Sequence, residues 1–199
     1  MAPQGCKMKY ILASMSPRRK EILKDMGLEF TVCPADIDEN IGVENPSLLV
    51  KELALLKASF IAKEHLGEES LVIAADTVVA LDEKILGKPK DKEDARRMLF
   101  LLSGRTHSVY TGFCVSDTKS GKTVAKCAKT DVYFKTLTEE EIDLYVESGE
   151  PLDKAGAYGI QGGAKGFVIK IDGEYSNVVG LPVDALTKLL KEEFVFEGR

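Results

Sequence analysis

A near-continuous apolar run, LVIAADTVVALD at residues 71–82, constrains the fold more strongly than any other stretch of the chain. The run is rich in valine and is interrupted by one acid, Asp76, and one hydroxyl, Thr77. Apolar runs without strict polar alternation are typical of strands that are buried on both faces. We therefore predict that residues 71–82 form a central strand.

Strand and helix patterns alternate along the rest of the chain. Further strands are expected at KYILA (9–13), in EFTVCPA (29–35), in both arms of a long hairpin around the turn TKSGK (118–122), and at FVIKIDG (167–173). Helices are expected from Pro17 to about Met26, from Pro46 to near Gly67, at about 92–102, after the capping box of Thr138 and Glu141, and from Pro182. This order predicts an α/β fold in which helices flank a mixed, twisted sheet.

The helix that begins at Pro46 has a specific expected face. Asn45 is suited to the N-cap and Pro46 to the first helical position. Leu49, Leu53, Leu56 and Phe60 then recur with helical spacing. We expect these four side chains to face the core.

The length and composition are those of one globular unit. With 199 residues, 44% of them hydrophobic, the chain is long enough to bury a sizeable core. We find no internal repeat and no low-complexity linker. We therefore predict a single domain over residues 1–199, built as two lobes around a cleft.

Charge and cysteine content narrow the classes of function. The net charge is −5, and lysines and arginines are spread among acids, which argues against nucleic acid but not against a small anion. The spacing of the cysteines and histidines does not predict a zinc site. We expect the cysteines to be free thiols in a reducing cytoplasm. These residues are Cys6, Cys33, Cys114, Cys127, His65 and His107. Without a leader or a run of about 20 apolar residues, a cytoplasmic protein with no membrane partner is expected.

The segment ASMSPRRKEIL (13–23) combines a helix start with two cations. Ser16 is suited to the N-cap, yet Arg18 and Arg19 fall in the first turn, where the helix dipole favours anions. A polyphosphate bound by free backbone N–H groups and both guanidinium groups, with Ser14 close by, would remove this conflict. In the structural alternative, the serines cap the helix and the arginines extend into solvent.

Three other segments hold polar residues that local structure does not explain. Asp76 needs a cation, a metal or a strand end facing a cleft if it is buried; the alternative is a surface turn between two shorter strands. Lys88, in the loop ILGKPK, either contacts phosphate or is solvated. The glycine-rich stretch 148–166 places Gln161 on a loop that can approach a ligand, although its glycines also suit tight turns. The residues alone thus predict an α/β protein that binds a phosphorylated ligand.

Taken together, these segments resemble the Maf family of nucleoside triphosphate pyrophosphatases over about residues 9–191. The resemblance is carried by LASMSPRRKEIL, DIDE (36–39), LALLKA (53–58), AADTVV, GKP, LSGRTHSVYTG and SGEPLDKAGAYGIQG. It implies a fold similar to that of inosine-triphosphate pyrophosphatases, with the site in a cleft between lobes. It also implies hydrolysis of a nucleoside triphosphate to the monophosphate and pyrophosphate with a divalent cation, Mg²⁺ or Mn²⁺.

The resemblance also implies roles for individual residues. Asp76 matches the family's catalytic acid–base position, and Glu39 with Asp76 would supply carboxylates to the metal. The positions that match substrate-binding residues are Ser14, Arg18, Arg19, Lys57 and Lys88. The glycine-rich segment resembles the subgroup that acts on dTTP and UTP, in which the specificity positions match Arg18, Thr77 and Gln161.

Several points stay open at this stage. The substrate can be a normal or a modified pyrimidine nucleotide, and a homodimer is suggested by resemblance alone. One alternative function is a non-catalytic, nucleotide-sensing regulator of septum formation. The other is a nucleic-acid-binding module, which the lack of a basic stripe disfavours.

Overall fold

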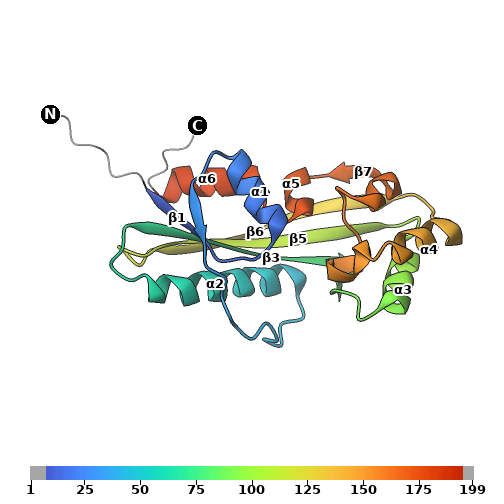
Figure 1. Cartoon of the computed structure of the whole chain (residues 1–199), viewed down its shortest axis with the longest axis horizontal. Helices are drawn as coiled ribbons and strands as arrows, with labels where there is room; N and C mark the ends of the chain where they lie inside the picture. The colour runs from blue at the N-terminus through green and yellow to red at the C-terminus, as the bar shows by residue number, and fades with distance from the viewer. Residues whose placement is uncertain (1–7, 195–199) are drawn as a thin grey trace.

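The computed structural model describes residues 8–194, and its long axis follows the long strands of one sheet (Figure 1). Within these residues, the seven-stranded sheet has the order β2-β1-β3-β5-β6-β7, with β4 paired to β3. The strands are β1 (Lys9–Leu12), β2 (Phe30–Val32), β3 (Ser70–Leu81), β4 (Lys84–Leu86), β5 (Thr106–Asp117), β6 (Thr123–Phe134) and β7 (Val168–Asp172). β1 is parallel to β2 and β3, and the remaining pairs are antiparallel.

Helices cover the sheet and its far end. They are α1 (Pro17–Asp25), α2 (Pro46–Glu64), α3 (Lys92–Leu102), α4 (Glu139–Glu147), α5 (Tyr175–Val179) and α6 (Val183–Glu193). Three 3₁₀ turns, η1 (Glu150–Asp153), η2 (Ala155–Ala157) and η3 (Gly163–Phe167), lie between α4 and β7. Figure 1 shows α1 and α6 on one side of the sheet, α2 on the other, and α3 and α4 at the opposite end of the long strands.

The predicted α/β class with a mixed sheet and flanking helices is confirmed. The hairpin of β5 and β6, the capping box of α4 and the N-caps Ser16, Asn45 and Asp91 are all present. The five-residue helix α5 was not predicted. A cleft between two lobes stays a prediction, as does the single-domain boundary, whose ends 1–7 and 195–199 lie outside the described residues.

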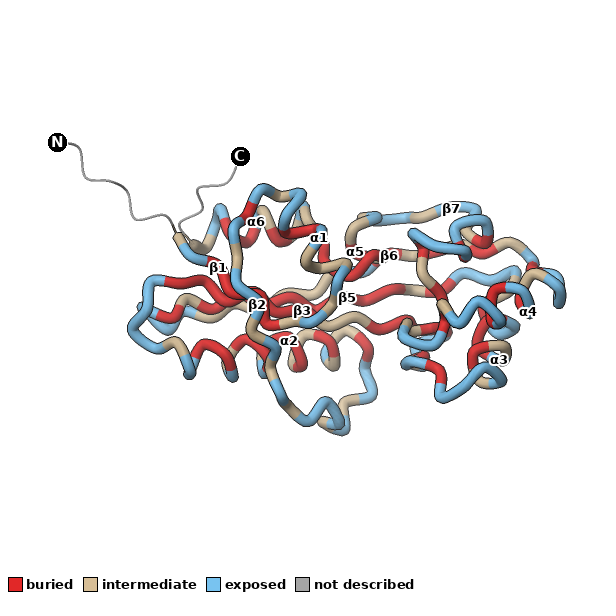
Figure 2. Tube along the Cα trace, viewed as in Figure 1, coloured by how far each residue is buried: buried red, intermediate tan, exposed pale blue. Residues whose placement is uncertain are grey.

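Strand β3 is central and continuous, as predicted, so the surface-turn alternative for Asp76 is wrong. Leu71 and Ile73 belong to the larger apolar core, which α1 and α6 share, whereas Val72 and Ala74 belong to a second core beneath α2. Burial on both faces explains why the run shows no polar alternation. Figure 2 shows that buried residues are concentrated along β3 and the neighbouring long strand β5.

One edge of β3 is open at the middle of the strand. β1 pairs with β3 as far as Leu12 opposite Ile73, and β4 begins to pair at Val79 opposite Leu86. Among the described residues, no strand pairs with this edge of residues 74–78. The chain leaves β1 here and turns into α1, so the start of α1 lies beside the gap. Carboxyl ends of parallel strands are common ligand sites.

The predicted core face of α2 is right for its first half, where Leu49 packs against a small cluster around Val50, and wrong for its second half. Leu53 is buried, but Leu56 and Phe60 are 41% and 39% exposed. The side chains that face the sheet are mostly small, namely Val50, Ala54, Ala58, Ile61 and Ala62. Small side chains let the helix approach the strands closely, and Lys57 is buried as well.

The cysteines and the helices of the described residues bear on two further expectations. Cys33, Cys114 and Cys127 are free thiols, whereas Cys6 lies outside the described residues. Within residues 8–194, no helix has the length and apolar character that a membrane span needs.

Candidate active site

The N-terminus of α1 holds Arg19 rather than leaving it in solvent. The Ser16 hydroxyl accepts a hydrogen bond from the Arg19 backbone N–H at 3.5 Å, which caps the helix. The Arg19 guanidinium donates to Ser14 Oγ at 3.0 Å, to Thr77 Oγ1 at 3.0 Å and to the Gly180 carbonyl at 2.8 Å. These bonds use three of its five N–H donors and leave two for a ligand.

The charges around α1 differ for its two arginines. Burial lowers the pKa of Arg19, and the nearby carboxylate of Asp76 partly opposes this shift. The pKa of Asp153 is lowered, first by a hydrogen bond from Lys154 and to a smaller extent by the charge of Arg18. The charge of Arg18 thus acts both on Arg19 and on Asp153 of the glycine-rich stretch.

Lys57 joins two carboxylates from different parts of the chain. Its Nζ lies 2.6 Å from Asp76 Oδ1 on β3 and 2.6 Å from Glu39 Oε1 in the loop before α2. The side chains of Lys57 and Asp76 are 10% and 14% exposed, and that of Glu39 is 61% exposed. The cation that the buried position of Asp76 requires is therefore Lys57.

Thr77 connects the arginine to the sheet. Its hydroxyl shares a 3.0 Å hydrogen bond with that of Thr111, the residue opposite on β5. Thr111 in turn donates to the Asn177 carbonyl of α5 at 3.1 Å. Because successive residues of a strand point to opposite faces, Asp76 faces α2 while Thr77 faces α1 and α5. Both residues belong to the part of β3, residues 74–78, whose edge has no partner strand among the described residues.

Two of the predicted site residues are less constrained. Lys88 and Gln161 are exposed, the first in the loop after β4 and the second in the turn between η2 and η3. The two segments are tied together, since Gly156 N–H donates to the Gly87 carbonyl at 3.0 Å. The structure thus brings Ser14, Arg19 and Thr77 into contact, and Glu39, Lys57 and Asp76 into contact. The catalytic, metal-binding, substrate-binding and specificity roles of these six residues stay predictions, as do those of Arg18, Lys88 and Gln161.

Sequence reasoning missed Thr111, Gly180 and Asn177. A threonine within a strand and a backbone carbonyl after a short helix give no signal in the sequence. Only the register of β3 with β5 and the return of the chain to α5 bring them to Arg19 and Thr77.

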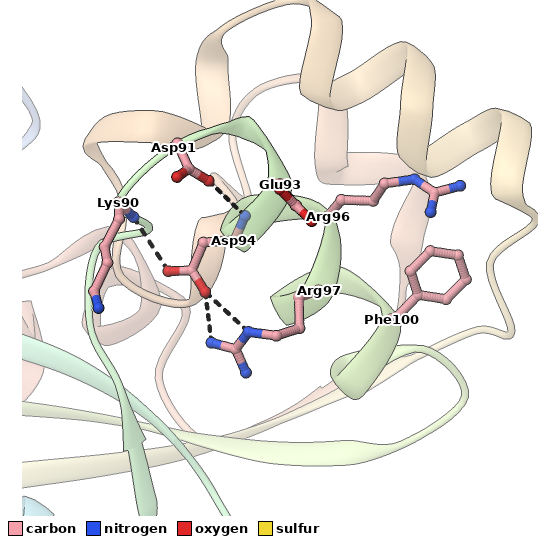
Figure 3. A pocket seen from close by; sticks show the side chains of 7 residues that line it. All are labelled: Lys90, Asp91, Glu93, Asp94, Arg96, Arg97 and Phe100. Atoms are coloured by element: carbon pink, nitrogen blue, oxygen red, sulfur yellow. Dashed lines mark hydrogen bonds and ion pairs between the residues drawn. The ribbon is translucent and has the colours of Figure 1, made fainter.

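A separate pocket lies on the surface of α3 (Figure 3). It is lined by Lys90, Asp91, Glu93, Asp94, Arg96, Arg97 and Phe100. Its charged groups bond one another; for example, the Arg97 guanidinium donates to Asp94 Oδ1 at 2.6 Å. None of the predicted site residues lines this pocket, so we do not assign the chemistry to it.

The carboxylates suit a hard divalent cation that substrate phosphates help to bind. Among residues 8–194, no cluster of three or more histidine, cysteine, aspartate or glutamate side chains could hold a metal ion. Glu39 and Asp76 nevertheless converge on one Lys57 ammonium, close enough to serve one cation. Mg²⁺ is commonly held by one or two carboxylates together with substrate phosphates, and these two residues fit that pattern.

Similarity to known proteins places the chain in a family. The family model described as "Maf-like protein" matches residues 9–193. This chain belongs to the Maf family. A relative named dTTP/UTP pyrophosphatase from Agathobacter rectalis is 53% identical over 197 residues, which cover 92% of this chain and 96% of the relative. A relative of the same name from Bacillus cytotoxicus is 51% identical over 185 residues, covering 92% of this chain and 95% of the relative.

A solved structure shares the architecture of this Maf-family chain. The Ham1 protein of Staphylococcus aureus aligns with a TM-score of 0.54 at 17% identity, covering 93% of this chain and 99% of that protein. At this identity the likeness shows the fold alone. It agrees with the α/β class and the mixed sheet described above.

Proposed function

We propose that this chain hydrolyses dTTP and UTP to the monophosphate and pyrophosphate. The observation that carries the proposal is the pair Asp76 and Thr77 at the open edge of β3. One residue presents a carboxylate paired with Lys57, and the next binds Arg19 at the start of α1. A base and an anion site are thus adjacent along one strand. The names of the relatives support the same reaction.

The anion is the triphosphate chain. It carries close to four negative charges, which must be neutralised before a nucleophile can approach phosphorus. Arg18, the two free N–H groups of Arg19, and Lys88 supply cations around the N-terminus of α1, where the helix dipole also favours anions. The bound phosphates remove the electrostatic conflict between the two arginines and the dipole.

Asp76 acts on the attacking water. It orients the water toward the α-phosphorus and accepts its proton. The bond between the α-phosphorus and the oxygen that bridges to the β-phosphate breaks, and the β- and γ-phosphates leave together as pyrophosphate. Lys57 fixes the Asp76 carboxylate by its 2.6 Å contact. Glu39 and Asp76 would hold a divalent cation, Mg²⁺ or Mn²⁺, which when bound neutralises phosphate charge and activates water.

The reaction is tested by measuring pyrophosphate release from dTTP, UTP and GTP with and without Mg²⁺. We expect release from dTTP and UTP to exceed that from GTP, and to stop when EDTA removes the metal. A panel of modified pyrimidine nucleotides in the same assay identifies the preferred substrate. No pyrophosphate from any triphosphate would contradict the proposal and favour a nucleotide-sensing regulator, which no described feature otherwise supports.

Replacing Arg18 by alanine is expected to weaken the binding of every nucleoside triphosphate. The KM should rise by about tenfold for dTTP and GTP alike, because one charge-assisted contact to phosphate is lost and phosphates are common to all. Steady-state kinetics with both nucleotides measure this. Lys20→Ala, two residues further along α1, is the matched control. Unchanged kinetics of Arg18→Ala would contradict a phosphate role.

Replacing Gln161 by alanine is expected to reduce discrimination between bases. An amide offers one donor and one acceptor, which complement the edge of uracil or thymine. The ratio of kcat/KM for dTTP to that for dGTP should fall by about tenfold, with little change for dGTP. The same substrate ranking as in the wild type would exclude Gln161 from base reading.

Three further points belong to this proposal. The activity cleanses the nucleotide pool, and the substrate panel decides whether its targets are normal or modified pyrimidine nucleotides. The protein works in the cytoplasm, and two copies form a homodimer. Sedimentation velocity measures the last point directly.

A further inference from the structure

Gln161 lies on a short turn with a defined backbone. The Gly162 N–H donates to the Gly159 carbonyl at 3.1 Å and closes the turn. Between these glycines, Ile160 is buried in the larger apolar core and Gln161 is exposed. The direction of the Gln161 amide therefore depends on what holds the two ends of the turn.

Tyr145 of α4 and Glu150 of η1 bind both ends. The Gly159 N–H donates to Tyr145 Oη at 3.0 Å, and the Gly163 N–H donates to Glu150 Oε2 at 3.0 Å. The Tyr145 hydroxyl donates to Glu150 Oε1 at 3.1 Å, so the two side chains are also joined to each other. We name these two residues the Tyr145–Glu150 clamp.

The glycines of the turn are the places where this clamp approaches most closely. A Cβ atom on Gly162 would lie 1.9 Å from Glu150 Oε1, and one on Gly163 would lie 3.0 Å from Tyr145 Cδ2. Gly162 has an ordinary φ of −103°, so its backbone conformation does not itself require glycine. A side chain at Gly162 would therefore displace the Glu150 carboxylate from its present position.

The clamp is itself well anchored. The Tyr145 ring is buried and forms a T-shaped pair with the Phe167 ring, at 5.3 Å between ring centroids. Burial raises the pKa of Tyr145, which keeps its hydroxyl protonated and able to donate to Glu150. Lys154, whose side chain is 14% exposed, donates from Nζ to the Glu150 carbonyl at 2.6 Å. The turn is thus held by α4 and η1 through these two side chains.

We propose that Tyr145 and Glu150 are positioning residues that set base discrimination by holding the turn that presents Gln161. The inference rests on the proposed function, in which Gln161 reads the pyrimidine edge. An amide discriminates between bases only if its donor and acceptor are fixed in direction, and the clamp supplies that constraint. Neither clamp residue needs to touch the substrate.

The kinetic test uses Glu150→Ala. The ratio of kcat/KM for dTTP to that for dGTP should fall about tenfold, to the level of Gln161→Ala, through a higher KM for dTTP with kcat changed by less than about twofold. Glu150→Gln keeps an acceptor for Gly163 and the same volume, so it should retain the ratio within about twofold. Tyr145→Phe keeps the ring but loses the hydroxyl, so its ratio should lie between those of Glu150→Ala and Glu150→Gln. Glu140→Ala, an exposed carboxylate in the first turn of α4, is the matched control.

Two measurements separate this inference from the proposed function. Amide hydrogen exchange at Gly159 and Gly163, read by NMR, should be at least about tenfold faster in Glu150→Ala and requires no activity. The ratio of kcat/KM for dTTP to that for dGTP should be no lower in the double variant Glu150→Ala/Gln161→Ala than in either single variant, because both substitutions act through one amide.

The outcomes are distinguishable. Faster exchange with an unchanged ratio in Glu150→Ala overturns the inference, as does a double variant whose loss is the product of the single losses. Unchanged exchange also overturns it, because the turn is then held by other contacts. A wild-type protein that releases no pyrophosphate from dTTP or UTP overturns the proposed function instead, and with it the link from the turn to specificity.

Discussion

Replacing Asp76 by asparagine is expected to lower kcat for dTTP by about 10²–10⁴-fold, the contribution of a positioned general base. Asparagine has the same shape but cannot accept a proton from water at neutral pH. The KM should change much less, because Arg18, Arg19 and Lys88 still bind the phosphates. Initial rates of pyrophosphate release over a range of dTTP concentrations measure both constants.

The fold should survive this substitution. Lys57 keeps its 2.6 Å contact with Glu39, and the asparagine carbonyl can still accept a hydrogen bond from Lys57. We expect the Tm to stay within about 4 °C of the wild type, which corresponds to about 1 kcal/mol for a chain of this size. Asp172→Asn, an exposed carboxylate on β7, is the matched control. A kcat within threefold of the wild type would remove Asp76 from the role of base.

The elements that sequence reasoning predicted are those with local signals. Asp91 and Thr138 are followed by helical periodicity, and each caps a helix in the structure. Continuous apolar composition was enough to identify β3 as central. The cost of burying Asp76 alone also indicated that it needs a cation, a metal or a strand end facing a cleft, and the structure supplies the cation, Lys57. In each case the deciding information lies within a few residues of the feature.

What sequence reasoning missed depends on contacts between distant segments. The helical spacing of Leu49, Leu53, Leu56 and Phe60 favoured Leu56 and Phe60 as part of the core side of α2. The sheet instead accepts the alanine side, where the helix can approach a strand closely. One of the three partners of the Arg19 guanidinium is the carbonyl of Gly180, which lies 161 residues away and has no side chain to reveal it. The clamp on the turn of Gln161 is tertiary in the same way.

The close approach of α2 to the sheet depends on Gly112 of β5. This residue lies opposite Asp76, and a Cβ atom added to it would be 2.0 Å from the Val50 carbonyl oxygen and 2.2 Å from its carbon. Both obstructing atoms belong to the helix backbone, so no side-chain rotation relieves the clash. Lys57 follows Val50 by two helical turns and shares its face of α2. Moving the helix away from β5 therefore also moves Lys57 away from Asp76.

Replacing Gly112 by alanine is consequently expected to damage both stability and catalysis. Overpacking of a core costs about 1–3 kcal/mol, and a backbone clash of this depth places the cost at about 3 kcal/mol or more. The Tm should fall by about 6–12 °C, measured by thermal and urea unfolding. Because a displacement of about 1 Å in a catalytic group can cost 10²-fold, kcat at a temperature where the variant is folded should fall by about that factor.

A matched substitution separates this effect from the general cost of replacing glycine in this chain. Gly166 in η3 has no atom within 4 Å of an added Cβ and no left-handed φ, so Gly166→Ala should change stability by less than about 0.5 kcal/mol. If Gly112→Ala loses stability but keeps full kcat, the position of Lys57 does not control Asp76. If Gly112→Ala loses neither stability nor kcat, α2 does not pack closely against β5 at Gly112, and the burial of Lys57 needs another cause. If Gly112→Ala loses both stability and kcat while Gly166→Ala keeps both, the function of the Asp76 carboxylate depends on the packing of α2 against Gly112.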